Sequence, residues 1–260
     1  MNYFFISDIH GNYDKMVAAL EANHFDKEKD TLVSVGDPFD RGFQSKEVLE
    51  YFMSCPNRIL LWGNHDRRLY YLVYQRAFYD YADYQNGILE TFHSLCGTRL
   101  RLFEEYTELL RKDKMLTKYF NECCFAIEFK NLIVTHAWLP VASYRDRGDT
   151  EYVVNPKWRN FNAQQWYDAL WSDSEFFAQS GCFPEKTLLI GHWHAWRLRE
   201  KFDKKKMIDK AQNIIDSSTY TIADKLIAID GCASYDKGGQ VNVYIYQSDE
   251  DPIKYPVYQK

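Results

Sequence analysis

The chain has 260 residues, of which 46% are hydrophobic and 27% charged, and its net charge at pH 7 is -5. These values predict a soluble α/β protein with one domain over residues 1–260, and the acidic balance argues against a general nucleic-acid binder. No apolar run approaches the roughly 20 residues that span a bilayer, and no leader pattern occurs. We therefore expect a cytoplasmic protein with reduced cysteines and neither nucleic acid nor membrane as a partner.

Strands and helices alternate in the first quarter of the chain. Buried strands are expected at residues 3–7, 31–35 and 58–62 because these runs are rich in branched and aromatic side chains. Helical spacing is found between them, at residues 13–22 and 45–52. The order βαβαβ predicts a mostly parallel sheet with right-handed crossovers.

Residues 66–118 have a helical pattern and are expected to form an insertion that covers a cleft. Aromatic residues recur in it at a spacing of three to four, namely Tyr70, Tyr71, Tyr74, Phe78 and Tyr81. The simpler interpretation is that this stripe packs on the sheet, and the alternative is that it stacks on a substrate.

The second half of the chain returns to strands. We expect a hairpin from residues 124–129 and 132–135, a strand at 187–190, and closing strands at 226–229 and 241–246 with a turn at 237–239. The basic run at residues 201–206 predicts a solvated loop, with a docking patch for an acidic partner as the alternative.

Five short polar segments each follow an apolar run, and each combines a potential metal ligand with a small residue. They are Asp8-Ile9-His10-Gly11, Gly36-Asp37-Pro38-Phe39-Asp40-Arg41-Gly42, Gly63-Asn64-His65-Asp66, Thr135-His136-Ala137 and Gly191-His192-Trp193-His194. Ligands at the ends of several strands converge on one edge of a sheet, which is the arrangement that a two-metal hydrolase requires.

The residue types suggest how these ligands are shared. Asp37 lies in a tight turn after a buried strand, and its carboxylate can bridge two cations. Asp8 and His10 alternate along an extended segment and suit the first metal. The second metal would take the ligands Asn64, His136 and His192. Nitrogen and oxygen donors without thiolate favour Mn, with an Fe/Zn pair as the alternative.

The same segments provide groups for hydrolysis of a phosphate ester. Two cations that share a water lower its pKa, so that it attacks phosphorus in line. His65 can donate the proton to the leaving oxygen, and Asp40 can keep His65 protonated. Arg41 can bind two phosphoryl oxygens. The alternatives are a turn residue that bonds its own backbone for Asp40 and a surface salt bridge for Arg41.

The segments Gly-Asp-Pro-Phe-Asp-Arg-Gly and Gly-Asn-His-Asp resemble those of calcineurin-like metallophosphoesterases, in particular the phosphoprotein phosphatases with their bacterial and phage members. The resemblance implies a four-layer α/β/β/α sandwich, the ligand distribution given above, and the pair of His65 with Asp40.

Two positions depart from the resembled pattern. His194 is a second histidine that many phosphoprotein phosphatases lack, and in the wider superfamily it joins the first metal; the alternative is a residue of the cleft wall. Those phosphatases also use a second arginine after the Thr-His segment. Arg159 is our candidate for that role, followed by Arg145 and Arg147.

The leading functional hypothesis is a phosphomonoesterase that releases inorganic phosphate from phosphoserine, phosphothreonine or small phosphate esters. A symmetrical dinucleoside tetraphosphate hydrolase is the second, because relatives with that activity share the metal motifs and the tyrosine-rich helix could stack on adenine. Nuclease chemistry is disfavoured by the acidic charge. A metal-binding scaffold without catalysis is disfavoured because Asp37, Asn64 and His65 are all present.

Overall fold

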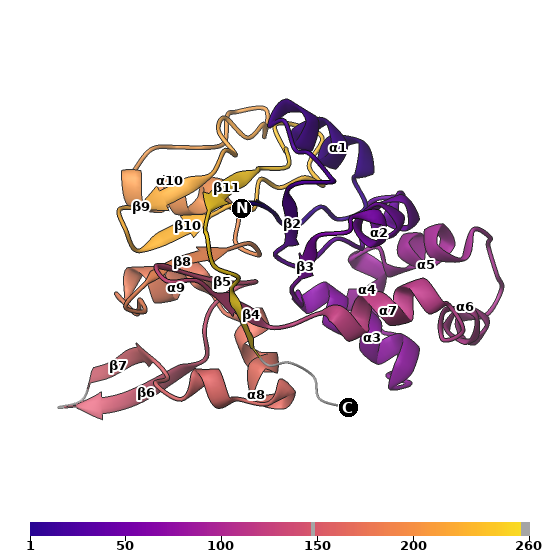
Figure 1. Ribbon diagram of the computed structural model, residues 1–260, viewed down its shortest axis with the longest axis horizontal. Coiled ribbons are helices and arrows are strands. Elements are labelled where there is room, and N and C mark those ends of the chain that lie inside the picture. The colour runs from indigo at the N-terminus through magenta and orange to yellow at the C-terminus, as the bar shows by residue number, and fades with distance from the viewer. Residues whose placement is uncertain (147–148, 256–260) are drawn as a thin grey trace.

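The computed structural model describes residues 1–146 and 149–255 (Figure 1). Its strands form two larger sheets and one ribbon. The first sheet contains β11 (Tyr244–Gln247), β1 (Asn2–Ile6), β2 (Thr31–Ser34) and β3 (Arg58–Leu60), in that order. The second contains β12 (Ile253–Tyr255), β4 (Ala126–Glu128), β5 (Leu132–Thr135), β8 (Thr187–Ile190), β10 (Leu226–Ala228) and β9 (Tyr220–Ile222). The ribbon consists of β6 (Val141–Asp146) and β7 (Asp149–Val154).

The first sheet confirms the predicted βαβαβ unit. Strands β1, β2 and β3 are parallel, and the helices α1 (Tyr13–Ala22) and α2 (Ser45–Ser54) connect them. The predicted hairpin is also present, since β4 pairs antiparallel with β5.

The two predicted closing strands are both present, as β10 and β11, but they lie in different sheets. Strand β10 pairs with β8 and β9 in the second sheet, whereas β11 pairs antiparallel with β1 at the edge of the first. The burial patterns fit these positions. All three residues of β10 are buried, as a strand with neighbours on both sides requires, whereas β11 alternates between exposed and half-buried residues, as an edge strand can.

Alternating side chains divide the apolar interior into layers. Tyr3 and Phe5 of β1 point into a core between the two sheets, together with Val134 and Leu189 of the second sheet. The intervening Phe4 of β1 belongs to the core beneath the helices. A strand with apolar residues on both faces must be covered on both sides, and the predicted helix-flanked sandwich is therefore confirmed.

Helices α3 to α7 gather with α1 and α2 on one side of the molecule, opposite the second sheet (Figure 1). The inserted helices are α3 (Asn64–Tyr74), α4 (Tyr81–Gln85), α5 (Ile88–Cys96), α6 (Phe103–Leu110) and α7 (Lys114–Glu122). The aromatic residues do not form a single stripe, because α3 ends at Tyr74. Tyr70 and Tyr74 pack on Phe120, whereas Phe78 and Tyr81 are exposed.

Short helices complete the fold after the ribbon. They are η1 (Trp158–Asn160), α8 (Ala163–Tyr167), η2 (Asp168–Trp171), α9 (Ser174–Gln179) and α10 (Ala195–Asp203). The basic run at 201–206 is exposed apart from half-buried Phe202. Its first half forms the last turn of α10, and the left-handed Lys204 follows as the C-cap.

The six cysteines are free thiols, and Cys123 and Cys124 belong to different cores. Over residues 1–146 and 149–255, every helix is too short or too polar to cross a bilayer.

Candidate metal centre

The sandwich brings the polar segments together at one edge. Asp8, Asp37, His136 and His192 follow the ends of β1, β2, β5 and β8, each within three residues. Asn64 begins α3 after β3. Because β1, β2 and β3 are parallel, and β5 and β8 are parallel, their carboxyl ends place these side chains around a common point.

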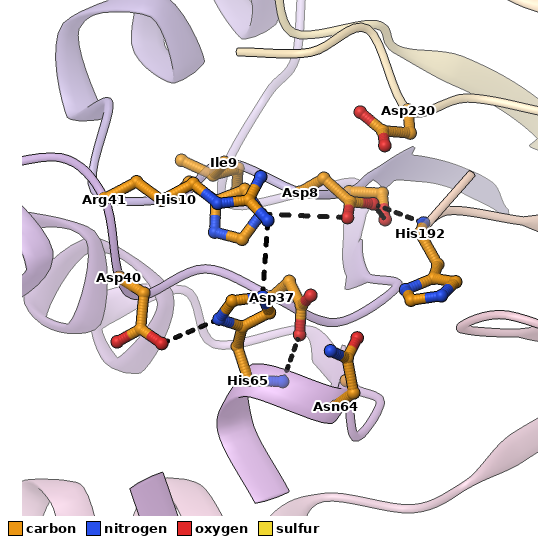
Figure 2. A network of polar contacts seen from close by, with 12 residues as sticks. Asp8, Ile9, His10, Asp37, Asp40, Arg41, Asn64, His65, His192 and Asp230 are labelled. Carbon is orange, nitrogen blue, oxygen red and sulfur yellow. Dashed lines mark hydrogen bonds and ion pairs between the residues drawn. The ribbon is translucent and has the colours of Figure 1, made fainter. Parts of the chain in front are cut away.

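Asp37 occupies the centre of the arrangement (Figure 2). It is buried and belongs to two groups of potential ligands, one with His10 and His65 and one with His136 and His192. Its Oδ2 atom lies 3.3 Å from His136 Nε2, and its Oδ1 atom accepts a hydrogen bond of 3.0 Å from the backbone N–H of His65. The geometry therefore gives Asp37 access to two cation positions, as a bridging carboxylate requires.

Backbone carbonyls orient two of the imidazoles. His10 Nδ1 lies 2.7 Å from the oxygen of Phe39, and His136 Nδ1 lies 2.8 Å from the oxygen of Val35. A carbonyl can only accept a hydrogen bond, so Nδ1 carries the proton in both rings. The Nε2 atoms are consequently available to metal ions.

The Nε2 atoms face the other predicted ligands. His10 Nε2 lies 4.0 Å from Asp8 Oδ1, and His136 Nε2 lies 2.9 Å from Asn64 Oδ1. The ring of His192 lies against that of His136, with 5.1 Å between their centroids. The structure thus brings the six predicted ligands other than His194 into one cluster.

The backbone at these residues is strained. Asp8, His10, Asp37 and His192 have φ angles of 52°, 48°, 55° and 58°. Side chains with a Cβ atom rarely adopt this left-handed conformation, and it costs of order 1–3 kcal/mol for each residue. Strain at four neighbouring polar residues marks a site whose geometry is maintained by the surrounding fold.

Glycine is required at Gly36 and Gly63 because polar side chains pass close to them. A Cβ atom on Gly36 would lie 2.6 Å from His136 Nδ1, and one on Gly63 would overlap the Asp37 carboxylate. Gly36 also has a φ of 98°. These two glycines allow Asp37 and His136 to approach each other.

The electrostatics of the cluster suit a cation. Burial, followed by the charge of Asp230, raises the pKa of Asp8 to about 7. Burial alone lowers the pKa of His136, but Asp37 outweighs it and raises this pKa to about 10. Burial and His136 lower the pKa of His192 to about 3. Divalent cations would stabilise the crowded, buried carboxylates, would bind the neutral ring of His192, and would replace the proton that Asp37 holds on His136, so the residues fit a dinuclear centre.

His65 lies beside the cluster in contact with two charged residues. Its Nδ1 donates to Asp40 Oδ2 over 2.7 Å, and its Nε2 lies 3.4 Å from the Arg41 guanidinium. Burial alone lowers the pKa of His65, but Asp37 and Asp40 raise it overall. Asp40 and Arg41 have φ angles of 70° and 64°, which turn both side chains toward His65.

Other buried residues of the site lay outside the sequence-based prediction. Asp66 accepts hydrogen bonds from the backbone N–H groups of Asp37 and Gly63 and from the hydroxyl of Tyr119. Its position as the third residue of α3, where an acid commonly caps a helix, was an available signal. Asp230, after β10, is a further buried acid, and Figure 2 shows it beyond Asp8.

Three predicted residues take other positions. His194 Nε2 lies 3.7 Å from Asp230 Oδ2, outside the two groups around Asp37. Arg159 binds Glu128 through two hydrogen bonds of 2.8 and 2.6 Å and stacks on Trp158, so its guanidinium is engaged away from the cluster. Arg145 is exposed on the ribbon, and Arg147 lies outside the described residues.

Comparisons with known proteins agree with this geometry. Residues 1–209 match the family model described as calcineurin-like phosphoesterase. The symmetrical bis(5'-nucleosyl)-tetraphosphatase of Hamiltonella defensa subsp. Acyrthosiphon pisum is 44% identical over 70 residues, which are 26% of each chain. The corresponding protein of Coxiella burnetii (strain RSA 493) is 32% identical over 120 residues, 45% of this chain and 39% of its own. The matches thus span well under half of these relatives.

Solved structures show the same fold at low identity. A protein proposed to be a diadenosine tetraphosphatase is 16% identical with a TM-score of 0.51, over 100% of this chain and 95% of its own. A mutant cold-active protein tyrosine phosphatase is 14% identical with a TM-score of 0.51, over 92% of this chain and 74% of its own.

Proposed function

The chain belongs to the calcineurin-like phosphoesterase family, and from this premise we propose that it is a metal-dependent hydrolase of phosphoric esters and anhydrides. The observation that carries the proposal is the buried Asp37 carboxylate, shared between two groups of histidines. Two divalent cations would be held by Asp8, His10, Asp37, Asn64, His136 and His192. The donors are nitrogen and oxygen atoms, which favour Mn, with Fe or Zn as alternatives.

The protein side chains have separate roles in the reaction. Bound metal ions would supply Lewis acidity and an activated water. Arg41 binds the phosphoryl group, because its guanidinium lies 3.4 Å from His65 Nε2 and therefore faces the same point. His65 donates its Nε2 proton to the leaving oxygen, while Asp40 holds Nδ1 and stabilises the protonated ring.

For the substrate, we favour a dinucleoside tetraphosphate over a phosphoprotein. The support is that the relatives matched at 32–44% identity are named as symmetrical bis(5'-nucleosyl)-tetraphosphatases. The His65–Asp40–Arg41 arrangement also suits a phosphomonoester, because any leaving alkoxide or phosphate oxygen needs the same proton. Small phosphate esters and phosphopeptides therefore remain the second candidate class.

Product analysis tests both parts of the proposal. Purified protein with Mn²⁺ is given diadenosine tetraphosphate, a phosphoserine peptide or p-nitrophenyl phosphate in parallel, and the products are separated by chromatography. We expect diadenosine tetraphosphate to give only ADP and to be the preferred substrate. Preference for the phosphopeptide would reject the dinucleotide and retain the hydrolase. If no substrate is turned over by protein with two bound metal ions, the hydrolase proposal itself fails.

A matched variant shows whether turnover belongs to this centre. His65→Ala removes the proton donor and leaves every proposed metal ligand in place. We expect unchanged metal content and a loss of kcat of about 10²–10³-fold, the usual contribution of a positioned general acid. Fe²⁺ and Zn²⁺ in place of Mn²⁺ then rank the metals.

A further inference from the structure

A third group of ligand atoms lies beside the proposed dinuclear centre. His194, Asp230 and Cys232 each offer one atom, and these atoms lie within 4.8 Å of one another. His194 Nε2 is 3.7 Å from Asp230 Oδ2. No member of this group is shared with the two groups around Asp37, and among the three groups found in the described residues this one alone contains a thiol.

The backbone fixes the three side chains relative to each other. The Ala195 N–H, which follows His194, donates to the carbonyl oxygen of Asp230 over 2.9 Å. The Cys232 N–H donates to Asp230 Oδ1 over 2.8 Å and leaves Oδ2 facing His194. Cys232 has a φ of 57°, a strained conformation that turns its side chain back toward the group.

Helix α1 anchors the loop that follows Cys232. Lys15 of α1 donates from its ammonium group to the carbonyl oxygens of Ala233, Tyr235 and Gly239 over 2.7, 3.0 and 3.2 Å. Three hydrogen bonds from one cation hold this loop in place, so Cys232 is positioned before any ligand arrives.

The three side chains lie between an apolar wall and the molecular surface. Cys232 packs against the apolar side chains of Trp196, Met207 and Ile214, which exclude water from one side. The His194 side chain is 19% exposed and provides the access. Its Nδ1 atom is buried and has no hydrogen-bond partner among the described residues, so no protein group competes with a ligand for this nitrogen. An apolar shell around mixed donors is common at transition-metal sites.

We propose that His194, Asp230 and Cys232 form a third metal site that binds a single Zn²⁺ or similar borderline cation through one nitrogen, one oxygen and one sulfur ligand. Thiolate and imidazole together select such ions over Mg²⁺ or Mn²⁺, and three protein ligands leave the fourth tetrahedral position open. The thiol proton is displaced to solvent when the metal binds. This site goes beyond the proposed hydrolase function and assigns His194 to a role separate from the Asp37 cluster.

Cobalt provides a direct readout that does not depend on turnover. Metal-free protein is titrated with Co²⁺, and the near-ultraviolet absorption is followed for the charge-transfer band that only a thiolate ligand produces. We expect three Co²⁺ ions per wild-type chain and a thiolate band. Cys232→Ser should bind two ions and lose the thiolate band. In the wild-type chain, excess Zn²⁺ should displace the Co²⁺ ion that produces the band.

Variants separate the site from its neighbours. Cys96→Ser, a substitution of a half-buried thiol at the end of α5, should keep the band and the third ion. His194→Ala changes a partly exposed position, so this variant should fold even if Cys232→Ser does not. It should lose both the thiolate band and the third ion. A wild-type chain that gives no thiolate band, or a band that survives both Cys232→Ser and His194→Ala, would overturn the proposal. Loss of hydrolysis with the band retained would affect only the proposed function.

Discussion

Thr91 and Asp40 are joined by two hydrogen bonds across a separation of 51 residues in the chain. The Thr91 hydroxyl donates to Asp40 Oδ1 over 2.9 Å and accepts from the Asp40 N–H over 2.8 Å. Asp40 uses its other carboxylate oxygen to hold His65. The inserted helix α5 therefore supports the proposed proton donor through one intermediate residue, a role for the insertion in addition to covering the sheet.

Replacing Thr91 with valine should impair catalysis without loss of metal. The isosteric change leaves a buried N–H and a carboxylate oxygen without partners, which costs about 1–3 kcal/mol. We expect kcat to fall about tenfold, while Thr91→Ser restores it. The matched control is Thr107→Val, a buried threonine of α6 whose hydroxyl donates to Glu104 of that helix and accepts from Arg111, the residue that follows it. Equal losses of activity in both variants would contradict a positioning role for Thr91.

The Asp40–His65 pair predicts a shift in the pH profile. A proton donor is active only below its pKa, so the rate should fall as the pH rises past the pKa of His65. Burial lowers this pKa, whereas the charges of Asp37 and Asp40 raise it. Asp40→Asn removes one raising charge, so the alkaline limb should move to lower pH. The measurement is kcat against pH at saturating Mn²⁺, and an unmoved limb would assign proton donation to another group.

Asp37→Asn should disrupt metal binding before it affects the fold. An amide keeps the shape of the side chain but offers one neutral oxygen, so it cannot serve two cations equally. We expect loss of at least one Mn²⁺ per chain and a fall in kcat of more than about 10²-fold, both read from metal analysis and phosphoester turnover. Full activity with two Mn²⁺ bound would exclude Asp37 as the bridge.

The structure explains which site residues could be predicted from the sequence. Asp8, Asp37 and His136 follow strongly apolar strands, and the carboxyl ends of parallel strands converge, so a local pattern was sufficient to place them together. Thr91 is different, because neither its spacing nor its residue type distinguishes it from any helical threonine. Its role arises only when α5 packs on α2 and presents its hydroxyl to the Asp40 turn.

Long-range contacts also place parts of the chain that local sequence patterns did not. The pairing of β11 with β1 joins residues more than two hundred positions apart, which no local turn signal encodes. Arg159 was selected by its order along the chain. Its position is instead determined by Glu128 on β4, to which Tyr255 of β12 also donates a hydrogen bond. Long-range partners of this kind override sequence order.

The Arg159–Glu128 pair makes a final prediction about stability. Hydrogen bonds from Arg159, aided by Lys186 and opposed by burial, lower the pKa of Glu128 from 4.5 to about 2. A carboxylate whose pKa is depressed on folding stabilises the fold above its unfolded pKa, and this stabilisation is lost as the pH falls from 4.5 toward 2. Arg159→Met should therefore lower the free energy of unfolding by about 1–2 kcal/mol at neutral pH, because solvent near the half-exposed guanidinium screens part of the interaction.

The control for this change is Arg145→Met, which removes an exposed arginine of the ribbon and should leave the free energy of unfolding within about 0.5 kcal/mol of wild type. Urea unfolding at several pH values measures both variants, and the difference between Arg159→Met and wild type should shrink toward pH 2 because protonated Glu128 no longer attracts the guanidinium. The same proteins test the alternative role. If Arg159 bound the substrate phosphate, Arg159→Met would raise KM for the phosphoester without a change that depends on the protonation of Glu128.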